Sequence, residues 1–208
     1  INHFIKRLHT EIHKVKPHVK FGISPFGIWK PGYPKQIRGL DAYDELYADA
    51  RLWLREGWLD YCAPQLYWQI NDKDQSYPVL MQWWHEQNPK GRHLWPGNNS
   101  AKVDPWPASE IINQIDLTRK HRGVTGNIHW NVSALVDNRN NLGTQLITRT
   151  YAQPALVPAS KWLNNRPPRA PAVSAKWDKA RGMIQINWRT AETKPIQWWL
   201  FQVKADNR

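Results

Sequence analysis

The feature that most constrains the fold of this chain is the regular alternation of helix-like and strand-like segments along it. Apolar residues recur at helical spacing in five stretches, residues 4–16, 43–57, 76–84, 107–121 and 142–151. Short apolar runs lie between them, at residues 19–24, 59–68, 93–96 and 124–132. Strands that alternate with helices predict a parallel β-sheet covered by helices.

The spacing of the expected strands favours a barrel over a doubly wound sheet. Their first residues lie roughly 40, 33 and 32 residues apart, and a (β/α)8 barrel of about 250 residues uses about 31 residues per unit. A doubly wound sheet would alternate in the same way, but no glycine-rich phosphate loop follows any of these runs. We therefore expect residues 1–151 to form the C-terminal half of a TIM barrel.

The composition changes after residue 151. Residues 152–171 are rich in Pro, Asn and Ala, and we expect them to form a linker. Alternating apolar residues follow, first Ile184, Ile186 and Trp188 and then Trp199, Phe201 and Val203. This pattern predicts the start of a β-sandwich at residues 172–208. The sequence opens inside a helical pattern and ends just after a strand-like run, so we expect both domains to be incomplete in this chain.

Charge and cysteine content limit the classes of partner. The formal net charge is +12, which raises affinity for anionic polymers and membrane surfaces. The basic residues are scattered, however, or gather at helix ends, where the helix dipole favours them. We therefore expect no nucleic-acid partner. The single cysteine, Cys62, lies in an apolar run, which indicates a buried thiol and excludes an internal disulfide.

The 14 tryptophans and the ends of the strands indicate where a ligand would bind. Trp offers a large flat apolar face for stacking, although about half of these residues are expected to fill the core. Barrel enzymes place their sites at the carboxyl ends of the strands and in the loops that follow. The residues at those positions that we assign to substrate binding are Ser24, Trp29, Gln65, Trp68, Asn98, Trp130 and Asn131.

Side-chain alternation along the second strand separates a site residue from a structural one. Tyr61, Ala63, Gln65 and Tyr67 share one face, which we expect to line the barrel interior. Tyr67 is the last of them before a polar loop, so its hydroxyl is the candidate catalytic group in this chain. Asp60 falls on the other face near the bottom of the barrel, and its expected role is structural.

Three motifs carry a resemblance to a known family. They are G-I-S-P-x-G-I-W at residues 22–29, Y-D-x-x-Y-A-D at residues 43–49 and D-Y-x-A-P-Q-x-Y-W at residues 60–68. The stretch from Phe21 to about Val132 resembles the glycosyl-hydrolase-like 10 family of bacterial envelope proteins. The resemblance implies a (β/α)8 barrel with a fibronectin-type-III-like appendage, glycoside hydrolase activity, and a periplasmic, outer-membrane-attached or secreted location.

The resemblance also implies where the chemistry is incomplete. In the family, the fourth strand ends in an acidic pair, F-D-D-Y, which does not occur in this sequence. The main catalytic acid is therefore expected outside this chain, which alone would be inactive. The segment Pro96–Val103 also departs from the family pattern, which weakens the assignment of substrate contacts there. Family 18 chitinases are similar in having Tyr and Trp at the positions of Tyr67 and Trp130.

We therefore expect a glycoside hydrolase that acts on a bacterial polysaccharide, with peptidoglycan glycan strands containing N-acetyl sugars as the substrate implied by the resemblance. We expect no metal and no other cofactor; the sequence leaves the oligomeric state open. Two alternatives remain, a non-catalytic barrel that binds glycan and a basic protein that binds anionic polymers. The sequence upstream of Ile1 would test the first, and a salt titration would test the second, because phosphate contacts give a steep salt dependence.

Overall fold

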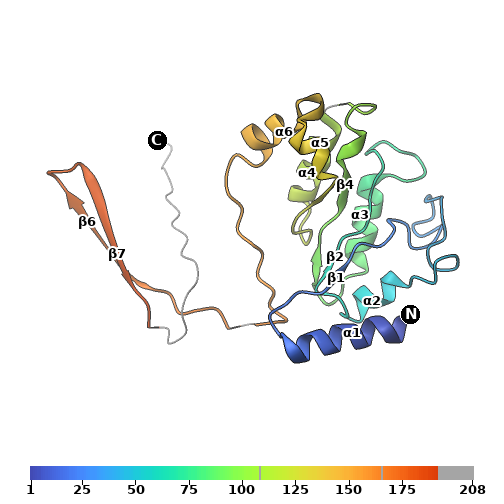
Figure 1. Ribbon diagram of the computed structural model, residues 1–208, viewed down its shortest axis with the longest axis horizontal. Helices are drawn as coiled ribbons and strands as arrows, with labels where there is room; N and C mark the ends of the chain where they lie inside the picture. The colour runs from blue at the N-terminus through green and yellow to red at the C-terminus, as the bar shows by residue number, and fades with distance from the viewer. Residues whose placement is uncertain (108, 165, 192–208) are drawn as a thin grey trace. The chain divides into compact units, whose positions relative to one another are not determined.

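Parallel strands form the centre of the amino-terminal part of the computed structural model (Figure 1), which describes residues 1–107, 109–164 and 166–191. The short strands β1 (Gly22–Ile23), β2 (Tyr61–Cys62) and β3 (His93–Leu94) pair in parallel in that order. The strands β4 (Gly97–Asn99) and β5 (Ile128–Trp130) also pair in parallel.

Bridges at Gln65 join these two sheets into one. Gln65 pairs in parallel with Phe26 on one side and with Gly97 on the other. The Gly97 amide donates to the Pro64 carbonyl at 2.8 Å, so β3 and β4 are successive parts of one strand. The described residues therefore contain a parallel sheet with four strand positions, which confirms the predicted alternation. The sheet is open, and the described residues do not close it into a barrel.

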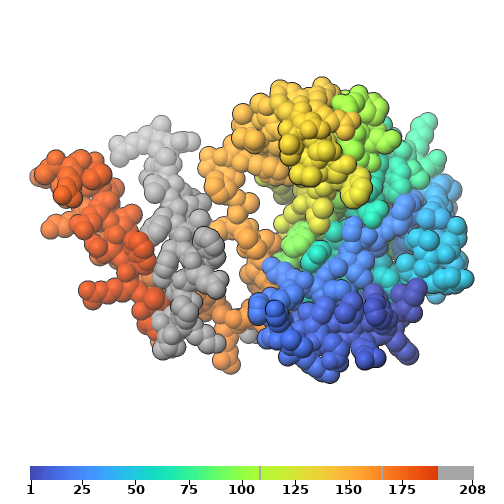
Figure 2. Space-filling model, viewed as in Figure 1, coloured from blue at the N-terminus to red at the C-terminus, as the bar shows by residue number. Residues whose placement is uncertain are grey.

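Helices connect the strands in the predicted order, and Figure 2 shows the surface that they form, with α1 in dark blue along its lower edge. The α-helices of this unit are α1 (Asn2–Val15), α2 (Ala50–Arg55), α3 (Tyr77–Glu86), α4 (Ser109–Lys120), α5 (Val132–Val136) and α6 (Leu142–Gln145). Single turns of 3₁₀-helix occur at Ser100–Lys102 and Arg139–Asn141, and a π-helical turn, Leu146–Thr150, continues α6.

One face of the sheet packs against the helices and forms the main core. Cys62 and Leu94 are fully buried on this face, together with Leu54, Leu80 and Trp84 from α2 and α3. Removing these apolar side chains from water is the main force that holds helices and sheet together. Burial raises the pKa of the Cys62 thiol, so the expectation of a buried thiol is confirmed.

The second helix is shorter than the sequence predicts. The apolar spacing from Tyr43 onward predicts a helix over residues 43–57 with Asp41 as its cap, but α2 begins only at Ala50. Tyr47 has a left-handed backbone, with φ 52°, and the Asp41 side chain instead accepts from the Asp44 amide in a turn at 2.8 Å. Asp49 is the actual cap and accepts from the Leu52 amide.

Part of the predicted linker packs on the amino-terminal unit. The two compact units of the chain are Ile1–Leu163 and Asn164–Arg208. Ser160 Oγ lies 2.9 Å from His93 Nε2, and the Trp162 indole donates to Asp60 Oδ1 at 2.7 Å. These contacts attach the segment up to Leu163 to the amino-terminal ends of β2 and β3.

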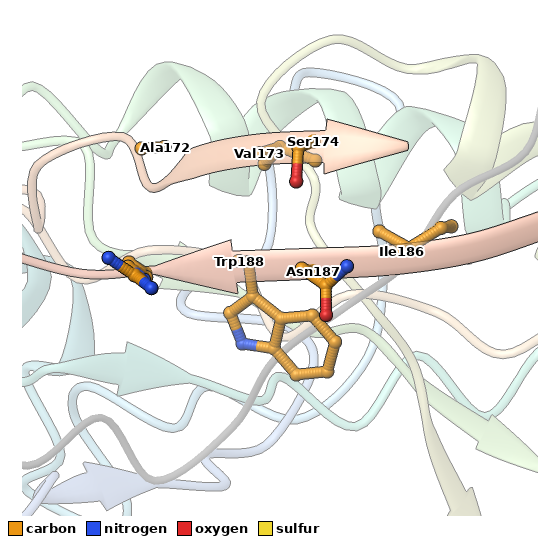
Figure 3. Close-up of a pocket in the computed structure, with 7 residues that line it drawn as sticks. Ala172, Val173, Ser174, Ile186, Asn187 and Trp188 are labelled. Carbon is orange, nitrogen blue, oxygen red and sulfur yellow. The ribbon is translucent and has the colours of Figure 1, made fainter. Parts of the chain in front are cut away.

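The second unit contains an antiparallel hairpin of β6 (Ala172–Asp178) and β7 (Met183–Arg189). Its register pairs Val173 with Trp188 and Trp177 with Ile184, so one face is apolar, as the alternation predicts. A hollow of about 590 Å³ lies along the hairpin and is lined by neither Tyr67 nor Trp130 (Figure 3). The further alternating run, Trp199, Phe201 and Val203, lies outside the described residues, and the β-sandwich stays a prediction.

Candidate functional site

The structure brings Tyr67 and Trp130 together at the carboxyl ends of the strands. Their ring centroids lie 6.5 Å apart, with an angle of 31° between the ring planes. Tyr67 follows β2, and Trp130 is the last residue of β5. Trp130 is 56% exposed, so most of its apolar surface is available to a ligand. The two rings form the centre of the candidate site.

Gly97 provides the space that Tyr67 occupies. A Cβ atom at Gly97 would lie 2.9 Å from Tyr67 Cε1 and 3.3 Å from the Pro64 carbonyl oxygen. Contacts this close require a neighbour to move, so a larger residue would displace the Tyr67 ring. The absence of a side chain at Gly97 of β4 therefore leaves room for the Tyr67 ring that carries the candidate catalytic hydroxyl.

The Tyr67 hydroxyl is available to a ligand. It forms no hydrogen bond to any residue that the structure describes, and burial raises its pKa above the usual value for tyrosine. The group is therefore protonated at neutral pH and can donate a hydrogen bond. A neutral donor at this position can orient an acetamido group or a carboxylate.

The third strand contributes Asn99 to this site, whereas Asn98 points away from it. Asn98 is fully buried. Its Nδ2 donates to Gln114 Oε1 at 2.8 Å, and its Oδ1 accepts from Asn127 Nδ2 at 2.9 Å. Asn99 lies opposite Trp130 in the sheet register. Its Oδ1 is buried and has no hydrogen-bond partner among the described residues. An unpaired buried acceptor is costly, so Asn99 is the better candidate for contacting a ligand.

Gln65 and Ser24 lie at the neighbouring strand ends. Gln65 Nε2 donates to the Ser24 carbonyl oxygen at 3.1 Å, which ties the end of the second strand to the end of the first. Gln65 is half-buried, and the Ser24 side chain is exposed. Gln65 lies between Phe26 and Gly97 in the sheet, and its assignment to the interior face stays a prediction.

Trp29 belongs to a separate aromatic cluster on the helix side. Trp83 of α3 stacks on it at 6.0 Å with an interplanar angle of 22°, and the Arg51 guanidinium lies over its ring at 4.9 Å. Its indole N–H donates to Asp49 Oδ1 at 3.0 Å. Because its ring and its donor are engaged within the chain, the structure does not place Trp29 with Tyr67 and Trp130.

Trp68 and Asn131 also have internal partners. The Trp68 ring meets Phe26 edge to face at 5.6 Å and packs against the main core. Asn131 is the N-cap of α5, where its side chain accepts from the Ala134 amide and from the Ser133 hydroxyl. Both residues are neighbours in sequence of a candidate site residue. Their described contacts are made within the chain and hold the backbone in place.

Buried polar groups that the sequence analysis did not single out hold the loop after Tyr67. Glu110 Oε1 accepts from the Ile70 amide at 2.8 Å, and Gln114 donates to the Trp68 carbonyl at 3.0 Å. Both belong to α4 and are at most 8% exposed. These two residues could have been found from the sequence, because they are polar residues on the apolar face of the predicted helix.

A hydrogen-bond chain supports the end of β5. His129 Nδ1 lies 2.8 Å from Ser100 Oγ, and its Nε2 lies 2.9 Å from the Tyr151 hydroxyl. Burial lowers the pKa of His129, which favours the neutral ring in this chain of polar groups. These bonds fix the residue that precedes Trp130.

The described part of the site lacks an acidic partner. Among residues 1–107, 109–164 and 166–191, no carboxylate hydrogen-bonds to Tyr67, Asn99 or Trp130. Glycoside cleavage usually needs two carboxylates, so these residues alone can bind and orient a sugar but do not complete the usual constellation. None of the helices that the structure describes combines the length and apolar content needed to cross a bilayer.

Comparison with known proteins identifies similarity to glycosidase-related proteins. The family model described as "Glycosyl hydrolase-like 10" matches residues 1–114. The chain is 38% identical over 213 residues to "Glycosyl hydrolase YngK" of Bacillus subtilis (strain 168), covering 93% of the chain and 41% of that protein. It is 34% identical over 140 residues to "Glycosyl hydrolase DigH" of Escherichia coli (strain K12), covering 60% of the chain and 32% of that protein. The chain thus spans less than half the length of either relative.

Proposed function

The chain belongs to the glycosyl-hydrolase-like 10 family, and from that premise we propose that it contributes the glycan-binding part of a glycoside hydrolase active site, centred on Tyr67, Asn99 and Trp130. The family implies a TIM-barrel-like glycosidase fold, and the parallel sheet with alternating helices agrees with it. The observation that carries the proposal is the meeting of Tyr67 and Trp130 at the strand ends, where barrel enzymes bind their substrates.

The chemistry of these residues suits a sugar that carries neutral polar groups. The exposed Trp130 ring provides an apolar platform for the face of a sugar ring. The Tyr67 hydroxyl can donate, and Asn99 Oδ1 can accept, without either side chain carrying a charge. An acetamido group offers both a carbonyl acceptor and an N–H donor, so this pair supports a substrate that contains N-acetyl sugars.

Peptidoglycan glycan strands are the substrate that we propose. Their N-acetyl sugars match the neutral donor and acceptor, and the formal net charge of +12 favours an acidic polymer. The substrate implies a bacterial envelope location, which is part of the same proposal. The catalytic carboxylates would come from residues outside the described chain, because none bonds to Tyr67, Asn99 or Trp130 within it.

The test measures cleavage and binding by the full-length protein that carries this chain. The wild type should release new reducing ends from purified peptidoglycan glycan strands and not from cellulose. Trp130→Ala should weaken glycan binding by about 1–3 kcal/mol, taking the stacking of bases on aromatic side chains as a guide. Trp177→Ala is the matched control, because Trp177 is also 56% exposed but lies on β6.

Three outcomes separate the alternatives. Binding that depends on Trp130 without release of reducing ends would indicate a protein that binds glycan but does not hydrolyse it. The described site would permit this function, because no carboxylate bonds to its residues. Equal binding by both variants would remove Trp130 from the site. Binding that disappears steeply with added salt, with no dependence on Trp130, would favour a binder of anionic polymers.

A further inference from the structure

Two histidines of α1 and a buried aspartate gather at the opposite end of the sheet from the glycan site. His13 Nε2 lies 3.1 Å from Asp60 Oδ2, and His9 Nε2 lies 3.9 Å from Asp60 Oδ1. One ligand atom of each residue lies within 4.8 Å of those of the other two. Asp60 is fully buried, whereas the two histidine side chains are about one-fifth exposed, at 21% and 19%.

The helical spacing of the two histidines places their rings side by side. Residues four apart in a helix lie on the same face, and the His9 and His13 ring centroids are 4.3 Å apart. His13 Nδ1 lies 2.8 Å from the His9 carbonyl oxygen, which can only accept. Nδ1 therefore carries a hydrogen, and in the neutral ring the lone pair is on Nε2, toward Asp60.

A proton alone does not account well for this arrangement. His13 Nε2 is buried and makes no hydrogen bond to any described residue, although it lies 3.1 Å from a carboxylate oxygen. The direction of the ring therefore does not suit an N–H···O bond. Without a hydrogen between them, a nitrogen lone pair and a carboxylate oxygen this close repel each other. A cation placed between the three donors would remove that repulsion.

We propose that His9, His13 and Asp60 bind a divalent transition-metal ion, for which Zn²⁺ is the best match. Zn²⁺ bonds of about 2.0–2.2 Å to nitrogen and oxygen place neighbouring donors of a tetrahedral site about 3.3 Å apart. The distance from His13 to Asp60 already fits, and small rotations of His9 would bring its Nε2 into range. Two imidazoles four residues apart with one carboxylate form a common ligand set for this ion.

The surroundings of Asp60 support a ligand role. Its Oδ2 accepts from the Phe21 amide, and its Oδ1 accepts from the Trp162 indole, each at 2.7 Å. Outer hydrogen bonds of this kind orient a ligating carboxylate and leave each oxygen a further lone pair.

Arg92 is the other charged group that acts on this cluster. Its guanidinium donates to the Gly57 carbonyl and lies over the Trp162 ring, 4.7 Å from the centroid. It forms no hydrogen bond to Asp60 among the described residues, so it does not pair directly with the carboxylate. The metal would link α1, the start of β2 and the segment that carries Trp162.

The test uses this chain after treatment with a chelator. Calorimetric titration with Zn²⁺ should show one tight site per chain, and Zn²⁺ should raise the melting temperature. Loss of a residue that only orients a ligand weakens metal binding by about 10–100-fold. His9→Gln and His13→Gln remove a ligand itself, so each should weaken Zn²⁺ binding by at least as much. The matched control is His3→Gln, an exposed histidine on the same helix, which should leave the tight site unchanged.

A spectroscopic measurement on the unmutated chain does not depend on the folding of variants. Co²⁺ in place of Zn²⁺ should give the intense visible absorption of a tetrahedral site, and added Zn²⁺ should remove it. The proposal is overturned if the unmutated chain shows no tight site, or if His9→Gln and His13→Gln bind Zn²⁺ as tightly as His3→Gln does. An octahedral Co²⁺ spectrum would also contradict the proposed ligand set.

Discussion

Two adjacent asparagines show how single residues divide between structure and site. Side chains alternate across a strand, so Asn98 enters the buried network with Gln114 and Asn127, while Asn99 lies opposite Trp130 with an unpaired Oδ1. The sequence analysis assigned the ligand contact to Asn98, but the Asn98 side chain is fully buried, so Asn99 is the better candidate. Trp95 and Pro96 interrupt the strand between β3 and β4. Side-chain alternation therefore could not be continued from β3 to show which face Asn98 and Asn99 occupy.

We expect opposite effects from removing these two side chains. Asn98→Ala removes the described donor to the buried Gln114 Oε1 and one acceptor of the Asn127 amide, and it should lower the free energy of unfolding by about 1–3 kcal/mol. Asn99→Ala removes no hydrogen bond of the described structure, so the melting temperature should hold while glycan affinity falls. Thermal melting and glycan binding, measured on both variants, check this; a reversed pattern would return Asn98 to the site.

The stability of the chain should depend on pH through His129. Burial lowers its pKa in the folded state, so below the unfolded value of about 6.5 the unfolded chain binds a proton that the folded chain does not. The free energy of unfolding should therefore fall as the pH drops below about 6.5 and should not change from this cause above it. Melting curves from pH 7.5 to 5 should show a smaller dependence in His129→Gln. An unchanged dependence would mean that His129 titrates normally in the fold.

At the scale of elements, strands and helices could be predicted, but the start of α2 could not. Apolar spacing located the strands and helices because each of these elements buries apolar residues in the shared core. It failed over residues 43–49, where Tyr43, Leu46 and Tyr47 have helical spacing but are exposed. Competition between two aspartate caps is a local event that apolar spacing does not record.

The two possible helix starts can be distinguished by substitution. Asp49 Oδ1 accepts from both the Leu52 amide and the Trp29 indole, so Asp49→Ala should lower the free energy of unfolding by at least about 1 kcal/mol, the usual cost of losing a cap. Asp41→Ala removes only a turn bond and a long, partly buried ion pair with Lys30, 3.7 Å between Nζ and Oδ2, and should cost less. Denaturant unfolding of the two variants provides the comparison, and a larger loss in Asp41→Ala would mean that the helix begins before Ala50.

At the scale of the whole molecule, the family assignment and the parallel sheet agree, and we propose that residues outside the described chain complete the active site. The chain covers 41% of its Bacillus subtilis relative, and no carboxylate bonds to Tyr67, Asn99 or Trp130 among the described residues. The sequence could locate Tyr67 and Trp130, because strand ends are readable from apolar runs. It could not show that Trp29 is engaged by Arg51 and Trp83, because those contacts join separate elements.

We propose that the Tyr67 hydroxyl acts on the reacting sugar, and Tyr67→Phe in the full-length protein is the most direct test. The change removes one oxygen that has no partner in the described structure, so the fold should survive. Tyr61→Phe is the matched control, because Tyr61 lies on the same face of the strand but stacks on Trp95 at 4.6 Å. On peptidoglycan glycan strands, Tyr67→Phe should lower kcat by about 100-fold or more with KM little changed, the pattern of an interaction made mainly in the transition state. Turnover within a few-fold of the Tyr61→Phe control would contradict the account.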